Sequence, residues 1–381
     1  MYQLIDRFIE KIMKESTPMR PYWNIESIKA GKEPHWNYID GCMMTSLLEL
    51  YKETQDDKYI KFVENFIDYY VFEDGTLRGY QMENFSTDDI CESRVLFDLY
   101  ALTGKEKYNK AIEYTYKQIM HQPRTKEGSF WHKNIYPNQV WLDGLFMAQP
   151  FYTLYETYRN KKQNYIDIIH QFKTVRSVMF NPEKKLYYHG YDASKTMFWA
   201  DPSTGLSKNF WLRAMGWYVV GIVDVMGYME DEKAKKEFFS PLLQEIIDGL
   251  LQYQDHESKL FYQVVDMKDR LGNYLEASGS ALICYAILKG TRLKVLDPSY
   301  AQIGLDIFSG ISRKYLSKRN GDLNLGGICL VAGLGPEHNL RRDGSYEYYI
   351  SEPIVENDAK GVGPLIMAYT EVKKVLKNQL D

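Results

Sequence analysis

The sequence predicts an all-α fold in which six pairs of helices form a ring, with long loops and short strands at one end. Two observations support this prediction. Apolar residues recur at helical spacing in twelve segments. Three segment starts, Lys58-Tyr59, Lys107-Tyr108 and Asn164-Tyr165, also resemble one another, and similarity about every 50 to 57 residues indicates a repeated supersecondary unit. Because the repeats run through the whole chain, we expect residues 1–381 to form a single domain.

The predicted helices are joined by connections of two lengths. We place the helices roughly at residues 3–16, 38–54, 57–72, 87–102, 106–121, 143–159, 163–180, 208–229, 234–252, 274–290, 297–316 and 357–376. Connections between pairs are short. Connections within pairs are long and cover residues 73–86, 122–142, 181–207, 253–273 and 317–356. If the helices alternate in direction, every long loop lies at the same end, and loops on a rigid scaffold usually carry binding and catalysis.

Four of the long loops contain a short strand-like element. These elements are GTLRGY (75–80), GSFWHK (128–133), KLYYHG (185–190) and KLFYQV (259–264), and their fifth positions hold Gly79, His132, His189 and Gln263. Because side chains alternate along a strand, the fifth positions point the same way from each loop. His132 and His189 are therefore predicted to converge on one mouth, although a structural role for each histidine stays an alternative.

Composition excludes several classes of partner and site. The formal charge is -4, from 47 basic and 51 acidic residues, which argues against nucleic acid or an anionic membrane as a partner. The four cysteines are scattered without C-x-x-C spacing, so neither a zinc site nor a redox pair is expected. The N-terminal segment carries frequent charges, and no run approaches the roughly 18 apolar residues of a membrane span. We expect a soluble, cytoplasmic protein.

Polar residues mark the starts of the second helix in each pair. These starts lie near Asp40, Asp88, Asp143, Arg213, Glu276 and Asn357. A ring of helix N-termini forms an electropositive basin that suits anions. Simple helix capping is the alternative interpretation for each of the aspartates.

Asp143 has features beyond those of a capping residue. It lies in the apolar, aromatic stretch VWLDGLFMAQPF (140–151), two residues after Trp141 and before Gly144, which leaves room for a ligand near the backbone. Desolvation would raise the pKa of Asp143, and a nearby Asp88 carboxylate would raise it further, against the helix dipole. Such a pair can titrate together with one proton held near neutral pH, which is the condition for a general acid.

Arg213 and Trp217 lie four residues apart and therefore on one helical face, with Trp211 just before them. An arginine beside tryptophans suits a sugar carboxylate or a glycan ring. An ion pair on an aromatic core helix is the alternative. No glycine-rich phosphate loop, metal-ligand spacing or nucleophilic serine motif is present.

Four segments stand out along the chain: VWLDGLFMAQPF, NFWLRAMGWYVVGIVDVM (209–226), EASGSALICYAILKG (276–290) and GSYEYYISEPIVENDAKGVGP (344–364). Together they resemble the unsaturated rhamnogalacturonyl hydrolases of glycoside hydrolase family 105. The resemblance implies an (α/α)6 barrel that acts on oligosaccharides with a 4,5-unsaturated galacturonyl residue at the non-reducing end. It further implies a proton donor at Asp143, a second aspartate at Asp88, and site residues at His132, His189, Arg213 and Trp217. Residues 36–40 match less well.

The reaction implied by the resemblance is hydration of a vinyl ether. A proton delivered to C4 leaves an oxocarbenium ion at C5, water captures it, and the ring opens with loss of the aglycone. Asp143 would donate the proton and then accept one from water, without a metal or an organic cofactor. Two alternatives remain: an unsaturated glucuronyl hydrolase acting on glycosaminoglycan fragments, and a non-catalytic glycan-binding barrel.

Overall fold

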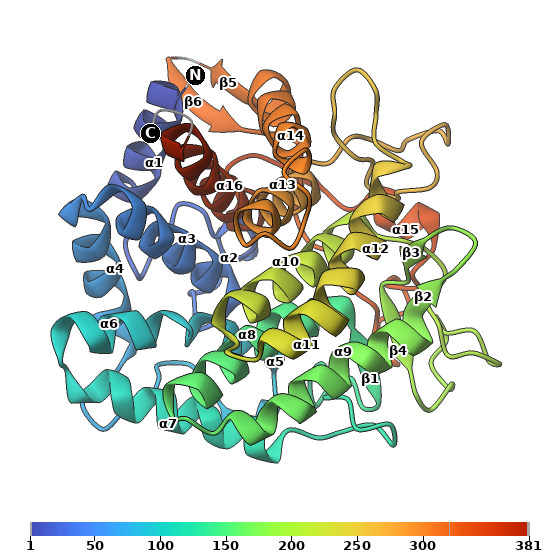
Figure 1. The fold of residues 1–381 in the computed structure, drawn as a ribbon, viewed down its shortest axis with the longest axis horizontal. Coiled ribbons are helices and arrows are strands. Elements are labelled where there is room, and N and C mark those ends of the chain that lie inside the picture. Colours follow the sequence, from blue (N-terminus) through green and yellow to red (C-terminus); the bar gives the residue numbers. More distant parts are fainter. Residues whose placement is uncertain (1, 320, 379–381) are drawn as a thin grey trace.

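Six inner helical elements close into a ring in the computed structural model, which describes residues 2–319 and 321–378 (Figure 1). Each packs on the next, and the last packs back on the first. In chain order they are α3 (Tyr38–Thr54), α5 (Thr87–Glu92) with α6 (Val95–Thr103), α8 (Leu142–Tyr158), α10 (Leu212–Tyr228), α13 (Ala277–Arg292) and α16 (Ala359–Asn378). The predicted helical barrel is confirmed.

Six outer helices cover this ring. They are α1 (Tyr2–Lys14), α4 (Asp57–Tyr70), α7 (Glu106–His121), α9 (Tyr165–Met179), α12 (Ser240–Leu251) and α14 (Tyr300–Tyr315). Each outer helix buries one stripe, as α4 does with Tyr59, Val63, Phe66, Ile67 and Tyr70. The inner helix α10 is instead buried on every side from residue 212 to 226. This contrast follows from the sequence, because a one-sided apolar helix faces a core and an all-round apolar helix lies within it.

Several predicted helix bounds need correction. The helix expected at 87–102 breaks into α5 and α6, because hydrogen bonds of the i to i−3 type tighten the turn at Ser93 and Arg94. The helix expected at 234–252 begins only at Ser240 as α12, because its first residues form the end of α11 (Glu232–Ala234) and a π-helical turn (Lys235–Phe239). Two further helices, α2 (Ile25–Ala30) and α15 (Tyr346–Ser351), were not predicted. Short 3-10 turns lie at Met82–Asn84 and Lys162–Asn164.

Short antiparallel strand pairs order the long-loop end. β1 (Gln139–Trp141) pairs with β4 (Gly190–Asp192), with Trp141 opposite Gly190. The other pairs are β2 (Phe180–Asn181) with β3 (Leu186–Tyr187), β5 (Leu316–Arg319) with β6 (Asp322–Leu325), and β7 (Ile328–Cys329) with β8 (Ile354–Val355). The β1–β4 pair joins the loop that carries His132 to the loop that carries His189.

Membrane-spanning helices are absent from the described part of the chain. No helix there is both long and apolar enough to cross a bilayer.

Candidate active site

A cavity of about 220 Å³ lies at the long-loop end of the barrel. Its walls come from the first turns of α3, α5 and α8, from the loop before β1 and from the loop after β7. Charged and aromatic side chains line it, among them Asp88, Asp89, His132, Lys133, Trp141, Asp143 and Arg342. Four residues predicted for the site thus share one cavity: Asp88, His132, Trp141 and Asp143.

Asp143 lies in the first turn of α8 but does not cap it, since the N-cap residue is Trp141 and no side chain caps this helix. One Asp143 carboxyl oxygen instead lies 3.2 Å from His189 Nε2. His189 Nδ1 lies 2.7 Å from the Tyr349 hydroxyl. Burial raises the pKa of Tyr349 well above its usual range, so this hydroxyl keeps its proton and can donate it to Nδ1. His189 Nε2 then faces Asp143 with its proton, at ion-pair distance but without the alignment of a hydrogen bond.

Asp88, in the first turn of α5, is held as a carboxylate. Lys133 Nζ lies 2.5 Å from one of its oxygens, and His132 Nε2 lies 3.5 Å from the other. Burial opposes the charge, but Lys133, His132 and His35 together outweigh burial and keep the pKa of Asp88 below its usual range. The predicted contribution of Asp88 to a pair that titrates near neutral pH is therefore wrong. Asp89 is the aspartate of this turn whose pKa burial raises, to about 7.

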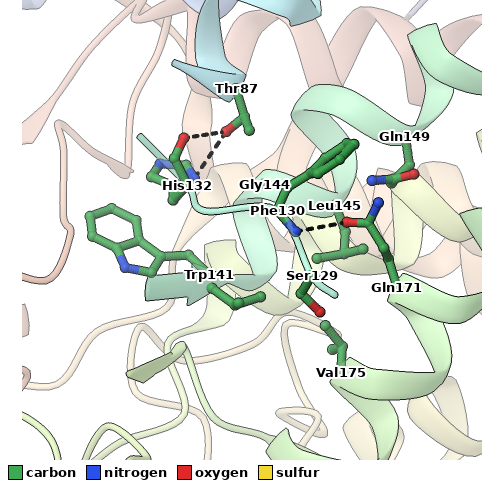
Figure 2. A pocket seen from close by; sticks show the side chains of 11 residues that line it. Thr87, Ser129, Phe130, His132, Trp141, Gly144, Leu145, Gln149, Gln171 and Val175 are labelled. Carbon is green, nitrogen blue, oxygen red and sulfur yellow. Dashed lines mark hydrogen bonds between the residues drawn. The ribbon is translucent and has the colours of Figure 1, made fainter. Parts of the chain in front are cut away.

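His132 is neutral at physiological pH, because burial lowers its pKa to about 4. Its ring stacks on Trp141 with centroids 4.3 Å apart, and Thr87 Oγ1 lies 3.1 Å from its Nδ1 (Figure 2). A Cβ at Gly144 would lie 3.2 Å from the same Nδ1. The space beside Gly144, predicted for a ligand, is occupied by His132.

A second, enclosed cavity shares His132 and Trp141 with the larger one (Figure 2). Its volume of about 10 Å³ corresponds to roughly one water molecule, which is too small for a sugar ring. Gln171 on α9 accepts a hydrogen bond of 3.1 Å from the Phe130 backbone N–H at this cavity. The residues around the small cavity therefore hold the loop that carries His132, and the cavity itself is not a substrate site.

Arg213 reaches the same end of the barrel but does not line the larger cavity. Its side chain is 1 % exposed, and Nε donates to Ser278 Oγ at 2.8 Å. Nη2 donates to the Cys329 carbonyl and lies 3.6 Å from the Glu276 carboxylate. The predicted contact between Arg213 and a ligand is corrected, because the guanidinium is committed to groups of the protein.

Trp211, Trp217 and His189 also lie behind the cavity wall. The Trp211 ring lies 4.8 Å from that of His189, which in turn positions Asp143. Trp217 packs edge-on against Tyr38, which does line the cavity. These three predicted binding residues therefore support the wall and do not form it.

Residues 36–40 contribute to the same wall. Asn37 and Tyr38 line the cavity, and Trp36 Nε1 donates to the Asp89 carbonyl at 2.9 Å. Asp40 lies deeper, where Trp23 Nε1 donates to its carboxyl at 2.6 Å and burial raises its pKa to about 7.

Three further residues of the cavity were not predicted from the sequence, namely Asp89, Lys133 and Arg342. For Lys133 the available signal was its place beside His132 in GSFWHK.

Metal ligation finds no support in residues 2–319 and 321–378, where no group of three or more His, Cys, Asp and Glu side chains is arranged to hold an ion.

Comparison with known proteins gives matches over almost the whole chain. The family model of Glycosyl Hydrolase Family 88 matches residues 4–376. A solved glycoside hydrolase of family 105 from C. acetobutylicum is 40 % identical, with a TM-score of 0.89 over 98 % of this chain and 99 % of that one. The unsaturated rhamnogalacturonyl hydrolase YesR of Bacillus subtilis is 26 % identical over 276 residues, 70 % of this chain and 75 % of YesR. A heparin-specific unsaturated glucuronyl hydrolase shares the fold at 14 % identity, with a TM-score of 0.69 over 99 % of this chain and 96 % of that one.

Proposed function

Since this chain belongs to glycosyl hydrolase family 88 and is similar over its length to a family 105 enzyme, we propose that it removes a 4,5-unsaturated galacturonyl residue from rhamnogalacturonan oligosaccharides. Similarity to YesR supports the galacturonyl substrate. The observation that carries the proposal is the presence of Asp143 and the Asp88–Lys133 pair in one cavity. A pectin-derived oligosaccharide is thus the proposed partner, and the cytoplasmic location stays a prediction.

Asp143 is the proposed proton donor. His132 is a poor donor near neutral pH because its pKa lies near 4, and Asp88 is held ionised by its charged neighbours. Asp89, whose pKa burial raises to about 7, is the rival acid in this cavity. Asp143 lies at the cavity with only part of its carboxyl held, by His189. A carboxyl in this position can deliver a proton to C4 of the double bond.

The fixed charge of Asp88 suits the next step. Protonation at C4 leaves positive charge at C5 and the ring oxygen, and a preorganised carboxylate stabilises such developing charge. Water then attacks C5 and gives up its proton to the Asp143 carboxylate, which restores the acid. The hemiketal opens, and the C1–oxygen bond to the aglycone breaks.

Substrate panels test this proposal. Purified enzyme should abolish the ultraviolet absorbance of unsaturated galacturonyl-rhamnose, and should act more slowly on unsaturated glucuronyl disaccharides from glycosaminoglycans. The reverse preference would favour the glucuronyl alternative. Unchanged absorbance with every unsaturated substrate would leave only glycan binding.

Isotope labelling tests the chemistry separately. In oxygen-labelled water, hydration places the label first at C5 of the unsaturated sugar, whereas ordinary glycoside hydrolysis places it at C1. A saturated galacturonyl analogue should not be cleaved, because it has no double bond to protonate. Early label at C1, or cleavage of the saturated analogue, would contradict the proposed mechanism.

A further inference from the structure

Arg342 is the cavity cation that the mechanism above does not use. It lies on the loop after β7 and lines the cavity with Asp88, Asp143 and Lys133. Lys133 is already paired with Asp88 at 2.5 Å. Among residues 2–319 and 321–378, no ion pair or side-chain hydrogen bond involves the Arg342 guanidinium. Burial opposes the charge of the guanidinium, but surrounding groups raise its pKa, with Glu352 and Glu26 acting only from a distance. A half-buried guanidinium without a hydrogen-bond acceptor keeps its N–H donors available for a ligand.

Arg342 is also held in place. A Cβ at Gly333 would lie 3.0 Å from Arg342 Nη1 and 3.2 Å from the Trp141 ring, so both groups press against the same glycine. The Arg342 carbonyl accepts from the Gly335 N–H at 2.8 Å, and Trp199 Nε1 donates to the Gly335 carbonyl at 3.1 Å. The loop therefore fixes the guanidinium beside Trp141 before any ligand arrives, which lowers the entropic cost of binding.

The charge of the cavity calls for such a cation. Asp88, Asp89 and Asp143 line the cavity, and a uronate substrate brings a further carboxylate. Arg213 cannot receive it, because its donors are bonded to Ser278 and the Cys329 carbonyl. Guanidinium groups bind carboxylates through paired, charge-assisted hydrogen bonds.

We propose that Arg342 is the receptor for a sugar carboxylate of the substrate, and that Gly333 secures its position. This inference rests on the proposed function for the identity of that carboxylate. The carboxylate belongs either to the unsaturated residue or to an acidic sugar next to it. Both sources present the same chemistry to the guanidinium.

Kinetics of Arg342→Ala test the inference, with Arg341→Ala as the matched control. Arg341 is the preceding residue, but it pairs with Glu352 at 2.8 Å, is 54 % exposed and does not line the cavity. Arg342→Ala should lower kcat/KM about 10- to 150-fold, mainly through KM, as expected for loss of a charge-assisted bond. Arg342→Lys should recover part of the loss, and Arg341→Ala should stay close to wild type.

Two substrates distinguish the sources of the carboxylate. A loss on unsaturated galacturonyl-rhamnose assigns the contact to the unsaturated residue, because the rhamnose is neutral. A loss confined to unsaturated digalacturonate assigns it to the second sugar. Folded Arg342→Ala and Arg342→Gln variants with wild-type KM on both substrates would overturn the inference.

Calorimetry with galacturonate and galactose separates this inference from the proposed function. Wild-type protein should bind galacturonate more tightly than galactose, and Arg342→Ala should lose that preference. Absence of turnover of every unsaturated substrate by the wild type, together with loss of the preference for galacturonate in Arg342→Ala, would contradict the proposed function and support the role of Arg342 as carboxylate receptor. If the preference for galacturonate is missing in the wild type or survives in Arg342→Ala, Arg342 is not the carboxylate receptor.

Discussion

Both ends of the barrel bury charged side chains, but they satisfy them differently. Toward the short-loop end, the Asp224 carboxylate on α10 accepts from Arg94 at 3.0 Å, Lys289 at 2.7 Å and Tyr285 at 2.8 Å, and its side chain is 1 % exposed. At the long-loop end the Asp143 side chain is 11 % exposed, and within the described chain its one ion-pair partner is His189. Buried charges that pair with one another stabilise the barrel, whereas charged groups that face a cavity are available for chemistry.

Asp143→Asn should have the largest effect of the changes that probe this comparison. The amide keeps the shape of the side chain but cannot deliver a carboxyl proton, so kcat should fall roughly 10²–10⁴-fold. The melting temperature should change little, because the cavity side of the residue is open. Loss of ultraviolet absorbance of the unsaturated substrate measures the rate.

Asp89→Asn is the matched control for that experiment. Asp89 lines the same cavity, and burial raises its pKa to about 7, so it is the rival carboxyl for the role of the acid. If Asp89→Asn abolishes turnover and Asp143→Asn does not, Asp89 is the acid and the role proposed for Asp143 is wrong.

Asp224→Ala should show the opposite behaviour to Asp143→Asn. It leaves the buried cations Arg94 and Lys289 without their shared carboxylate, a change that typically costs about 3–5 kcal/mol of folding stability. Activity per folded molecule should stay near wild type, since Asp224 does not line the cavity. Denaturant unfolding measures the stability, and a stable variant with reduced kcat would contradict the comparison.

Arg213→Ala tests whether a buried cation at the long-loop end acts in folding or in substrate binding. Like the charged side chains around Asp224, Arg213 is satisfied within the protein. Its guanidinium donates to Ser278 and the Cys329 carbonyl and lies near Glu276. Its removal should cost roughly 1.5–3 kcal/mol of stability, with little change in KM at temperatures where the variant is folded. A fully stable variant with a raised KM would show that Arg213 contacts the substrate.

These residues also show how far sequence reasoning reaches. The twelve helices followed from apolar periodicity, and the repeat register placed His132 and His189 at one end. The break between α5 and α6 was not predicted, because no glycine or proline marks it and it depends on the i to i−3 hydrogen bonds at Ser93 and Arg94. Arginine beside tryptophan occurs both in cores and in binding sites, so the sequence left both roles open for Arg213. Its distant partner, the Cys329 carbonyl, decides for the core role.

Lys133 and Arg342 could not be predicted as cavity residues for a similar physical reason, because their positions depend on loop conformation. Lys133 follows His132 directly, and strand alternation would point its side chain to the opposite face. In the structure the chain turns there, and Lys133 reaches Asp88 from the loop. Arg342 lies on a loop without periodicity, and its place beside Trp141 depends on Gly333 and on the contact between Trp199 and Gly335.

Lys133→Met should give the smallest effect, a shift of pH dependence. In the wild type, burial raises the pKa of Asp88, but Lys133, helped by His132 and His35, outweighs burial and holds the pKa low. Without the ammonium the pKa of Asp88 rises, so the carboxylate is lost at a higher pH as acid is added. If turnover needs ionised Asp88, the acidic limb of log kcat/KM moves to higher pH, while activity well above that limb changes less.

Stability should follow the same direction. A carboxyl with a lowered folded pKa stabilises the protein above its unfolded pKa, and this contribution disappears as pH falls through the folded value. Lys133→Met removes that contribution, so acid unfolding should begin at a higher pH than in the wild type. Lys126→Met is the matched control, because Lys126 lies on the same loop, is 73 % exposed and pairs with Glu127 at 3.7 Å. An acidic limb that stays in place in Lys133→Met would show that the Asp88 charge is set by other groups, or that turnover does not need it.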